Sequence, residues 1–199
     1  MKLDQSFLKG KYVTLEPMVI DHLEGLSVAG NDSQIWDFVT FSLDKKSSVT
    51  AFIGYVSALS EKGGGQSYAI RLNETKEIVG GTGYWHIDHQ NRKLEIGGSW
   101  VTPKYQKSMV NTEAKYLMIK NAFDNLKCNR VSFNIDALNE KSLRAIERIG
   151  AEREGISRND MQMIDGRIRD SVIYSIVKDE WPIKKLHLEA LLSKYDSKN

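Results

Sequence analysis

Hydrophobic and polar residues follow two different periods along this chain, one typical of strands and the other of helices. Strand-like runs occur at residues 12–15, 67–72, 77–87, 94–101 and 131–137. Helical spacing occurs at residues 22–29, 48–62, 112–126 and 140–149. The helix over 112–126 is the clearest, because its apolar residues form one stripe while Lys115, Lys120 and Asp124 lie off it.

The last part of the chain predicts a hairpin and a final helix. Residues 151–177 contain Asp165-Gly166, a pair favoured in tight β-turns. A last amphipathic helix, at about 181–195, begins near Trp181-Pro182, where proline costs little. Asn139 can cap the helix over 140–149, and Gly150 can end it. The order β-α-α-β-β-β-α-β-α-β-β-α indicates a mixed α/β (α+β) fold, a mostly antiparallel sheet flanked by helices, as a single domain over residues 1–199.

Composition narrows the class of protein. The chain has 28 Lys and Arg against 26 Asp and Glu, and this near balance argues against a nucleic-acid partner. Cys128 is the only cysteine, so an intrachain disulfide is impossible. The N-terminus carries charges where a signal peptide needs an apolar stretch, and no apolar run approaches the roughly 20 residues of a membrane span. We therefore expect a cytoplasmic protein with no membrane partner.

A strand, a polar loop and a long helix follow one another at residues 94–126. The start of a helix offers unpaired N–H groups and the positive end of its dipole, so the loop Gln106–Thr112 could bind a pyrophosphate. Lys104 and Lys107 would add positive charge there. An ordinary capped helix would explain the same pattern.

The segment YQKSMVNTEAKYLMIKNAFDNLKCNRVSFNIDALNEKSLRAIERIGAEREG resembles the acyl-CoA-binding half of the GNAT superfamily of N-acetyltransferases. It is similar in particular to the branch of ribosomal-protein alanine and serine N-terminal acetyltransferases (RimJ/RimL-like). The resemblance covers roughly residues 7–183. It implies a V-shaped opening between strands 94–101 and 131–137 that binds acetyl-CoA or another acyl-CoA, with no metal. The residues implied to contact this donor are Ser99, Trp100, Val101, Gln106, Lys107, Ser108, Met109, Val110, Asn111, Thr112, Asn139 and Ser142.

The implied reaction is acyl transfer to a primary amine, either a protein N-terminus or a small molecule. Met109 departs from the family loop, since glycine is usual at its position and lets the backbone approach a phosphate closely. Gly97-Gly98 suggests either a bulge that frees an N–H near Ser99 for the thioester oxygen, or glycines that give way to a bulky neighbour.

Three residues are candidates for proton transfer. Glu95 could accept a proton from the amine through water, or it could be a surface carboxylate paired with Lys93 or Arg92. The family tyrosine that serves as acid is replaced by Ile146, which leaves Ser142 as the first substitute and Tyr174 as the second. Ser142 could equally be an ordinary serine near a helix start.

The acceptor side is the least determined by the sequence. Trp36, Phe38 and Phe41 lie between the first two helices, where they could shape the acceptor site or simply belong to the core. His86-x-x-His89 lacks a third convincing metal ligand. Two other functions stay open: a catalytically weak sensor that binds acyl-CoA, and a nucleic-acid-binding protein that uses Arg158, Arg167 and Arg169. We expect a monomer or a homodimer.

Overall fold

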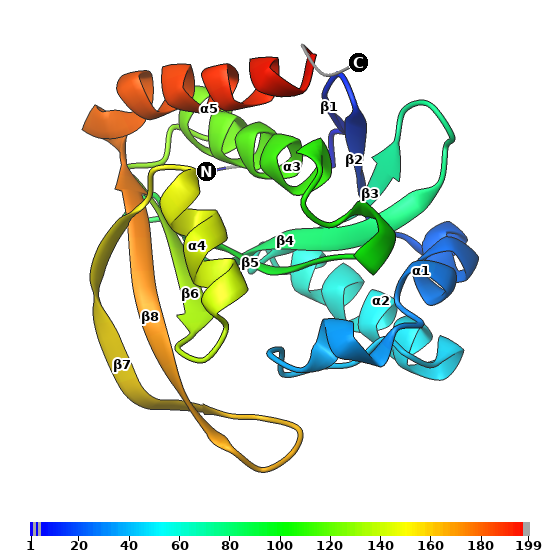
Figure 1. Cartoon of the computed structure of the whole chain (residues 1–199). Coiled ribbons are helices and arrows are strands. Elements are labelled where there is room, and N and C mark those ends of the chain that lie inside the picture. The colour runs from blue at the N-terminus through cyan, green and yellow to red at the C-terminus, as the bar shows by residue number, and fades with distance from the viewer. Residues whose placement is uncertain (2, 4, 197–199) are drawn as a thin grey trace.

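One twisted sheet runs through the molecule, and helices cover both of its faces (Figure 1). The computed structural model describes residues 1, 3 and 5–196. The strand order is β1-β2-β3-β4-β5-β6-β8-β7, and among these strands only β5 and β6 run parallel. The strands are β1 (Leu8–Lys9), β2 (Val13–Pro17), β3 (Gln66–Leu72), β4 (Ile78–Asp88), β5 (Lys93–Val101), β6 (Arg130–Asp136), β7 (Glu152–Gln162) and β8 (Ile168–Val177).

Two hydrophobic cores lie on the two faces of the sheet. The α-helices are α1 (Leu23–Ala29), α2 (Lys46–Glu61), α3 (Met109–Lys120), α4 (Glu140–Arg148) and α5 (Trp181–Asp196). Helices α1 and α2 pack on one face in a core that includes Trp36 and Trp100. Helices α3, α4 and α5 contribute to the larger core on the other face. The predicted mixed, mostly antiparallel fold is therefore confirmed. Among the described residues, no helix has the length and apolar character needed to cross a membrane.

The parallel strands β5 and β6 pair over only three residues before they separate. Their register joins Lys93 with Arg130, Leu94 with Val131 and Glu95 with Ser132. Beyond these pairs no further register between the two strands is formed, so the predicted V-shaped opening is present.

A bulge in β5 lies on one side of this opening. Gly81 faces Trp100 and Gly83 faces Gly97, so two residues, Gly98 and Ser99, stand opposite one residue of β4. Gly98 has a φ of +58°, a conformation that favours glycine. The bulge, one of the two alternatives that the sequence left open, is present and locally interrupts the pairing of β5 with β4; the bulky neighbour of the other alternative, Trp85, also lies against Gly98.

The helix that follows β5 begins three residues earlier than predicted. It starts at Met109 instead of Thr112, because the Ser108 side chain caps it by accepting the Val110 N–H at 3.2 Å. A single π-helical turn, Asn121–Asn125, extends it. Elsewhere the expected signals are confirmed: Asn139 caps α4, and Gly150 follows this helix with a φ of +89°. Strand β1, only two residues long, gave no periodic signal and was not predicted.

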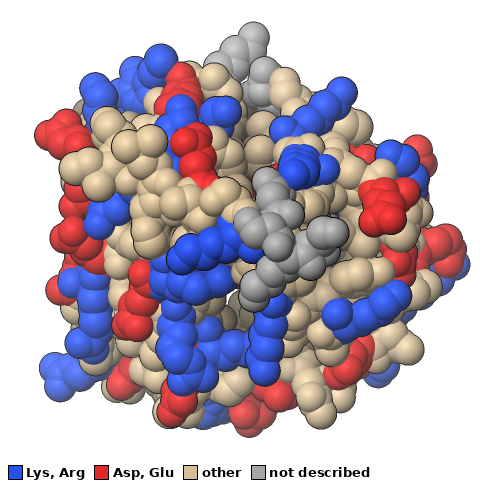
Figure 2. Space-filling view, turned by 45° about the horizontal axis from the view of Figure 1, so that its top comes forward, with Lys and Arg blue, Asp and Glu red and all other residues tan. Residues whose placement is uncertain are grey.

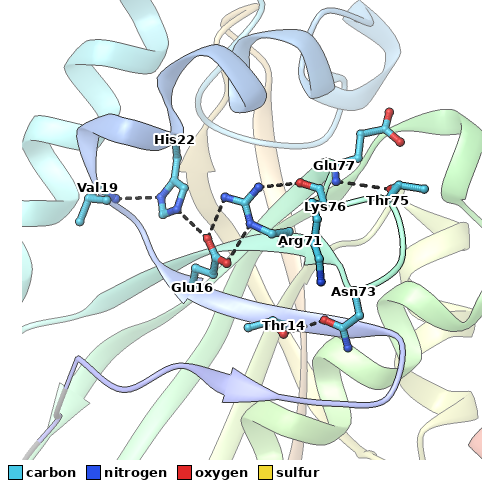
Figure 3. Close-up of polar contacts among 9 residues, drawn as sticks. All are labelled: Thr14, Glu16, Val19, His22, Arg71, Asn73, Thr75, Lys76 and Glu77. Atoms are coloured by element: carbon cyan, nitrogen blue, oxygen red, sulfur yellow. Dashed lines mark hydrogen bonds and ion pairs between the residues drawn. The ribbon is translucent and has the colours of Figure 1, made fainter.

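Two carboxylates, the half-buried Glu16 and the buried Glu113, fix the N-terminal strands. Glu16 on β2 accepts hydrogen bonds from Arg71 on β3 at 2.8 and 2.9 Å, and its carboxylate lies 2.9 Å from His22 Nε2 (Figure 3). The Arg71 guanidinium lowers the pKa of Glu16. Glu113 on α3 accepts the backbone N–H groups of Lys11, Tyr12 and Val13 at 2.7–2.8 Å. These contacts hold α3 against β2.

Candidate active site

A cavity of about 150 Å³ occupies the opening between β5 and β6. Its walls come from residues 96–99 of β5 and 133–136 of β6, from α3 and α4, and from Phe38 and Val39 in the α1–α2 connection. Arg169 on β8 closes part of one side. Polar groups from five different elements therefore meet around one hollow, which is the usual character of a ligand site.

Four of the predicted donor-binding residues line this cavity. They are Ser99 on the bulge, Asn111 in the first turn of α3, and Asn139 and Ser142 at the start of α4. The Asn139 side chain accepts the Ser142 N–H at 3.0 Å, so its predicted capping role is confirmed. Within the described part of the chain, no hydrogen bond engages the Ser142 hydroxyl.

Trp100, Val101 and Gln106 do not line the cavity. Trp100 and Val101 are buried and stand opposite Gly81 and Gly80 of β4. Gln106 donates from Nε2 to the Val101 carbonyl at 2.9 Å and accepts a hydrogen bond from Lys141. Gln106 therefore joins the end of β5 to α4.

The remaining predicted residues form the start of α3. Val110 and Thr112 are buried, and the Thr112 hydroxyl accepts a hydrogen bond from Arg148 at 2.9 Å. The left-handed backbone conformation lies at Lys107, with a φ of +60°, and not at Met109. Met109 is helical and packs against the main core, so a glycine is not needed there for conformational reasons.

Glu95 lies at the point where β5 and β6 separate. Its side chain is 13% exposed and accepts a hydrogen bond from Asn134 Nδ2 at 2.9 Å, while His86 Nε2 lies 3.9 Å away. Burial raises the pKa of this carboxyl group. Pairing of Glu95 with Lys93 or Arg92, the alternative that the sequence left open, does not occur. Lys93 lies 3.8 Å from Asp88, and Arg92 donates to backbone carbonyls.

Tyr174 has a different environment from Ser142. It is buried in β8, its hydroxyl donates to Glu147 at 2.7 Å, and it is not among the residues that line the cavity. Burial and the Glu147 carboxylate raise its pKa to about 12. Ser142 is thus the better placed of the two acid candidates.

Known proteins have sequences and folds similar to those of this chain. The family model described as "Acetyltransferase (GNAT) domain" matches residues 13–152. The chain belongs to the GNAT acetyltransferase family. A Bacillus subtilis relative named "Putative ribosomal N-acetyltransferase YdaF" is 37% identical over 100 residues, which are 50% of this chain and 54% of that protein.

Two solved structures extend the similarity to nearly the whole GNAT fold. A GCN5-related N-acetyltransferase from Brucella melitensis superposes with a TM-score of 0.89 and 26% identity, over 96% of this chain and 87% of that one. Mycobacterium smegmatis RimJ in complex with CoA-disulfide has a TM-score of 0.78 and 21% identity, over 90% and 88% of the two chains. The fold and the acetyltransferase class agree with the resemblance seen in the sequence.

The residues of this GNAT chain fit an acetyl-CoA co-substrate. The separation of β5 from β6 leaves room for an extended chain, and the capped start of α3 offers N–H groups for a pyrophosphate. Lys104 and Lys107 are exposed near that helix start. In Figure 2 the two signs of charge are interspersed over the surface, and several Lys and Arg side chains border a hollow near the centre of the view. When bound, the co-substrate supplies an acetyl group activated as a thioester.

The aromatic residues predicted for the acceptor side divide between core and cavity. Trp36 is buried, donates from Nε1 to the Gly30 carbonyl and packs 5.0 Å from the Trp100 ring. Phe41 stacks on Phe52 at 4.8 Å. Only Phe38 of the three lines the cavity. Trp36 and Phe41 therefore belong to the core that α1 and α2 form on their face of the sheet.

Lys115 is a cavity residue that the sequence did not indicate. Its position off the apolar stripe of α3 predicted a solvent-facing lysine, yet the residue is only 5% exposed and its Nζ lies 2.5 Å from Ser99 Oγ. Burial lowers its pKa to about 7. The one signal available was its spacing of four from Asn111, which places both residues on the same side of the helix.

The histidine pair remains a poor metal site. His89 is engaged by the Met1 and Gly63 carbonyls, and His86 lies near Glu95. In the described residues no group of three His, Cys, Asp or Glu side chains converges as metal ligands would.

Proposed function

We propose that this protein transfers an acetyl group from acetyl-CoA to a primary amine, by direct attack of the amine on the thioester in the cavity between β5 and β6. The observation that carries this proposal is the separation of the two parallel strands directly after Glu95 and Ser132. It brings a bulged strand and two helix starts to one hollow, and the carboxylate of Glu95 is hydrogen-bonded to Asn134 in the wall of that hollow.

The attacking amine has to be neutral, and Glu95 is the group best suited to take its proton. A carboxylate whose pKa is raised by burial is a stronger base than an exposed one. Glu95 is not itself among the residues that line the cavity, but its hydrogen-bond partner Asn134 is. The proton would therefore pass through water. The Ser142 hydroxyl would donate a hydrogen bond to the sulfur as the thiolate leaves.

A protein or peptide N-terminus is the acceptor to test first. The support is the name of the YdaF relative, a ribosomal N-acetyltransferase, together with the resemblance of residues 7–183 to that branch. A small amine is the other acceptor of the same chemistry, and it belongs in the same screen.

The test has a binding arm and a turnover arm. Acetyl-CoA at millimolar concentration should raise the melting temperature, because a ligand that binds only the folded state stabilises it. Release of free thiol should then depend on an added amine, and peptides with N-terminal alanine or serine should be compared with small alkylamines. Stabilisation without any amine-dependent thiol release would refute transferase activity and favour a sensor of acyl-CoA. An unchanged melting temperature would remove the proposed donor site.

A further inference from the structure

Lys115 is a buried lysine that faces the cavity and forms no ion pair with a carboxylate. Its side chain leaves α3 one turn after Asn111, and both residues line the hollow. No ion pair joins its Nζ to an acidic side chain anywhere in the described ranges. Taking an ammonium group out of water is costly, and burial accordingly lowers the Lys115 pKa to about 7. Near neutral pH the charged and neutral forms are therefore both populated, and a lysine kept at this place calls for a reason.

Two carboxylates lie near Lys115, and in the described residues neither forms an ion pair with it. Glu95 of β5 attracts Lys115 electrostatically and accepts a hydrogen bond from Asn134. Asp136 of β6 is paired with Arg167 at 2.5 Å. Arg169 of β8 is a second cation in the wall, and Asp136, Asp160 and Glu95 attract it. The Lys115 Nζ therefore has no carboxylate in direct contact and can interact with a charge that develops in the cavity.

The Ser99 hydroxyl, which is itself hydrogen-bonded to Thr82, holds the Lys115 Nζ at the bulge of β5. This Nζ lies 2.5 Å from Ser99 Oγ, and Ser99 Oγ lies 2.7 Å from Thr82 Oγ1. Ser99 directly follows Gly98, the residue whose left-handed conformation makes the bulge. Phe133 of β6 packs beside the lysine, with its ring centre 6.0 Å from Nζ. The ammonium is thus fixed where the pairing of β5 is interrupted.

We infer that Lys115 provides the positive charge that stabilises the thioester oxygen during acetyl transfer, an assignment that rests on the proposed function. As the amine nitrogen bonds to the carbonyl carbon, the C=O electron pair moves onto oxygen, and the ammonium form of Lys115 stabilises this oxyanion. When the C–S bond breaks, that pair re-forms the carbonyl, and the sulfur leaves with the bonding electrons and takes a proton from solvent by way of the Ser142 hydroxyl. The nitrogen loses its proton through water toward Glu95. The oxyanion exists only in the reacting state, and an interaction made only there accelerates the chemical step.

The first test needs no acceptor amine. The thiol of bound CoA is titrated by the ultraviolet absorbance of its thiolate, in the wild type, Lys115→Met and Lys115→Arg. In acetyl-CoA the sulfur is bonded to the same carbon as the thioester oxygen, so the thiol of bound CoA senses charge at the reacting centre. A nearby cation favours the thiolate and lowers the thiol pKa. We expect the thiol pKa to be lowest in the Lys115→Arg complex, whose guanidinium stays charged throughout the titration, and highest in the Lys115→Met complex.

The second test measures turnover with the amine that responds best in the acceptor screen. Lys115→Met should lower kcat about 10²- to 10³-fold, the usual loss for one oxyanion-stabilising group, while CoA affinity stays within a few-fold. Lys115→Arg should retain more activity than Lys115→Met, because it keeps the charge. A purely structural lysine would instead change stability and leave the thiol titration unmoved.

The two proposals fail in different ways. Absence of CoA binding by the wild type would remove the proposed function itself. Normal CoA binding with the same thiol pKa in folded Lys115→Arg and Lys115→Met complexes would overturn the role of Lys115. The role would also be overturned if folded Lys115→Met showed the same thiol pKa of bound CoA and the same turnover rate as the wild type.

Discussion

The replacement of Glu113 by alanine should destabilise the protein more than most single substitutions. Glu113 lies in α3 between cavity residues Asn111 and Lys115, and its carboxylate accepts three backbone N–H groups. Those donors belong to consecutive residues, Lys11 to Val13, at the start of β2. The variant would therefore loosen the strand from the helix that carries part of the active site.

The size of the loss follows from how exposed each donor is. Hydrogen bonds to charged groups contribute about 1.5–3 kcal/mol each, and a buried donor left unsatisfied loses the most. Val13 is fully buried, Tyr12 is partly buried and Lys11 is exposed, so water can replace the carboxylate at Lys11 most easily. Counting one full loss, one partial loss and one small loss gives a destabilisation of roughly 4 kcal/mol.

Urea denaturation followed by circular dichroism measures this quantity. Glu113→Gln keeps one acceptor oxygen and should lose about half as much as alanine, because one oxygen can still accept two of the bonds. Glu61→Ala is the matched control, since it removes the same group from an exposed position in α2 and should change stability by less than about 0.5 kcal/mol. A loss below about 1 kcal/mol for Glu113→Ala would refute the argument that this carboxylate joins β2 to α3.

Three further substitutions test the site. Glu95→Gln should lower kcat roughly 10²- to 10⁴-fold without altering CoA affinity. In the wild type the rate should increase as pH rises through the raised pKa of Glu95, since only the ionised form accepts a proton. Near-normal turnover of Glu95→Gln would exclude Glu95 as the proton acceptor. Asn139→Ala should cost about 1 kcal/mol through the lost cap and also weaken acetyl-CoA binding, whereas full ligand affinity would limit Asn139 to capping. Met109→Gly should destabilise by about 1 kcal/mol and leave acetyl-CoA affinity unimproved, because Met109 is helical and packed; tighter binding, measured by calorimetry, would contradict that interpretation.

Most secondary structure was predictable because its signals are local. The alternation of residues 131–137 depends only on which face of a strand is buried, and it predicted β6 almost to its ends. Asn139, Gly150 and Asp165-Gly166 marked a helix start, a helix end and a turn by their own side chains and conformations. The start of α3 was misplaced, because Ser108 caps the helix before its apolar stripe begins.

The sequence by itself determined the order of strands and helices and, through its resemblance to GNAT proteins, the position of the opening between two strands. Tertiary structure decided which side chains reach that opening. Trp36 and Gln106 do not line the cavity, because Trp36 packs on Trp100 and Gln106 is hydrogen-bonded to Val101 and Lys141. Lys115, which the helical pattern assigned to solvent, is buried because β5 and β6 separate beneath α3 and Ser99 accepts its hydrogen bond. Periodicity reports only whether a position is apolar, so it cannot reveal a charged residue that the fold encloses in a polar cavity.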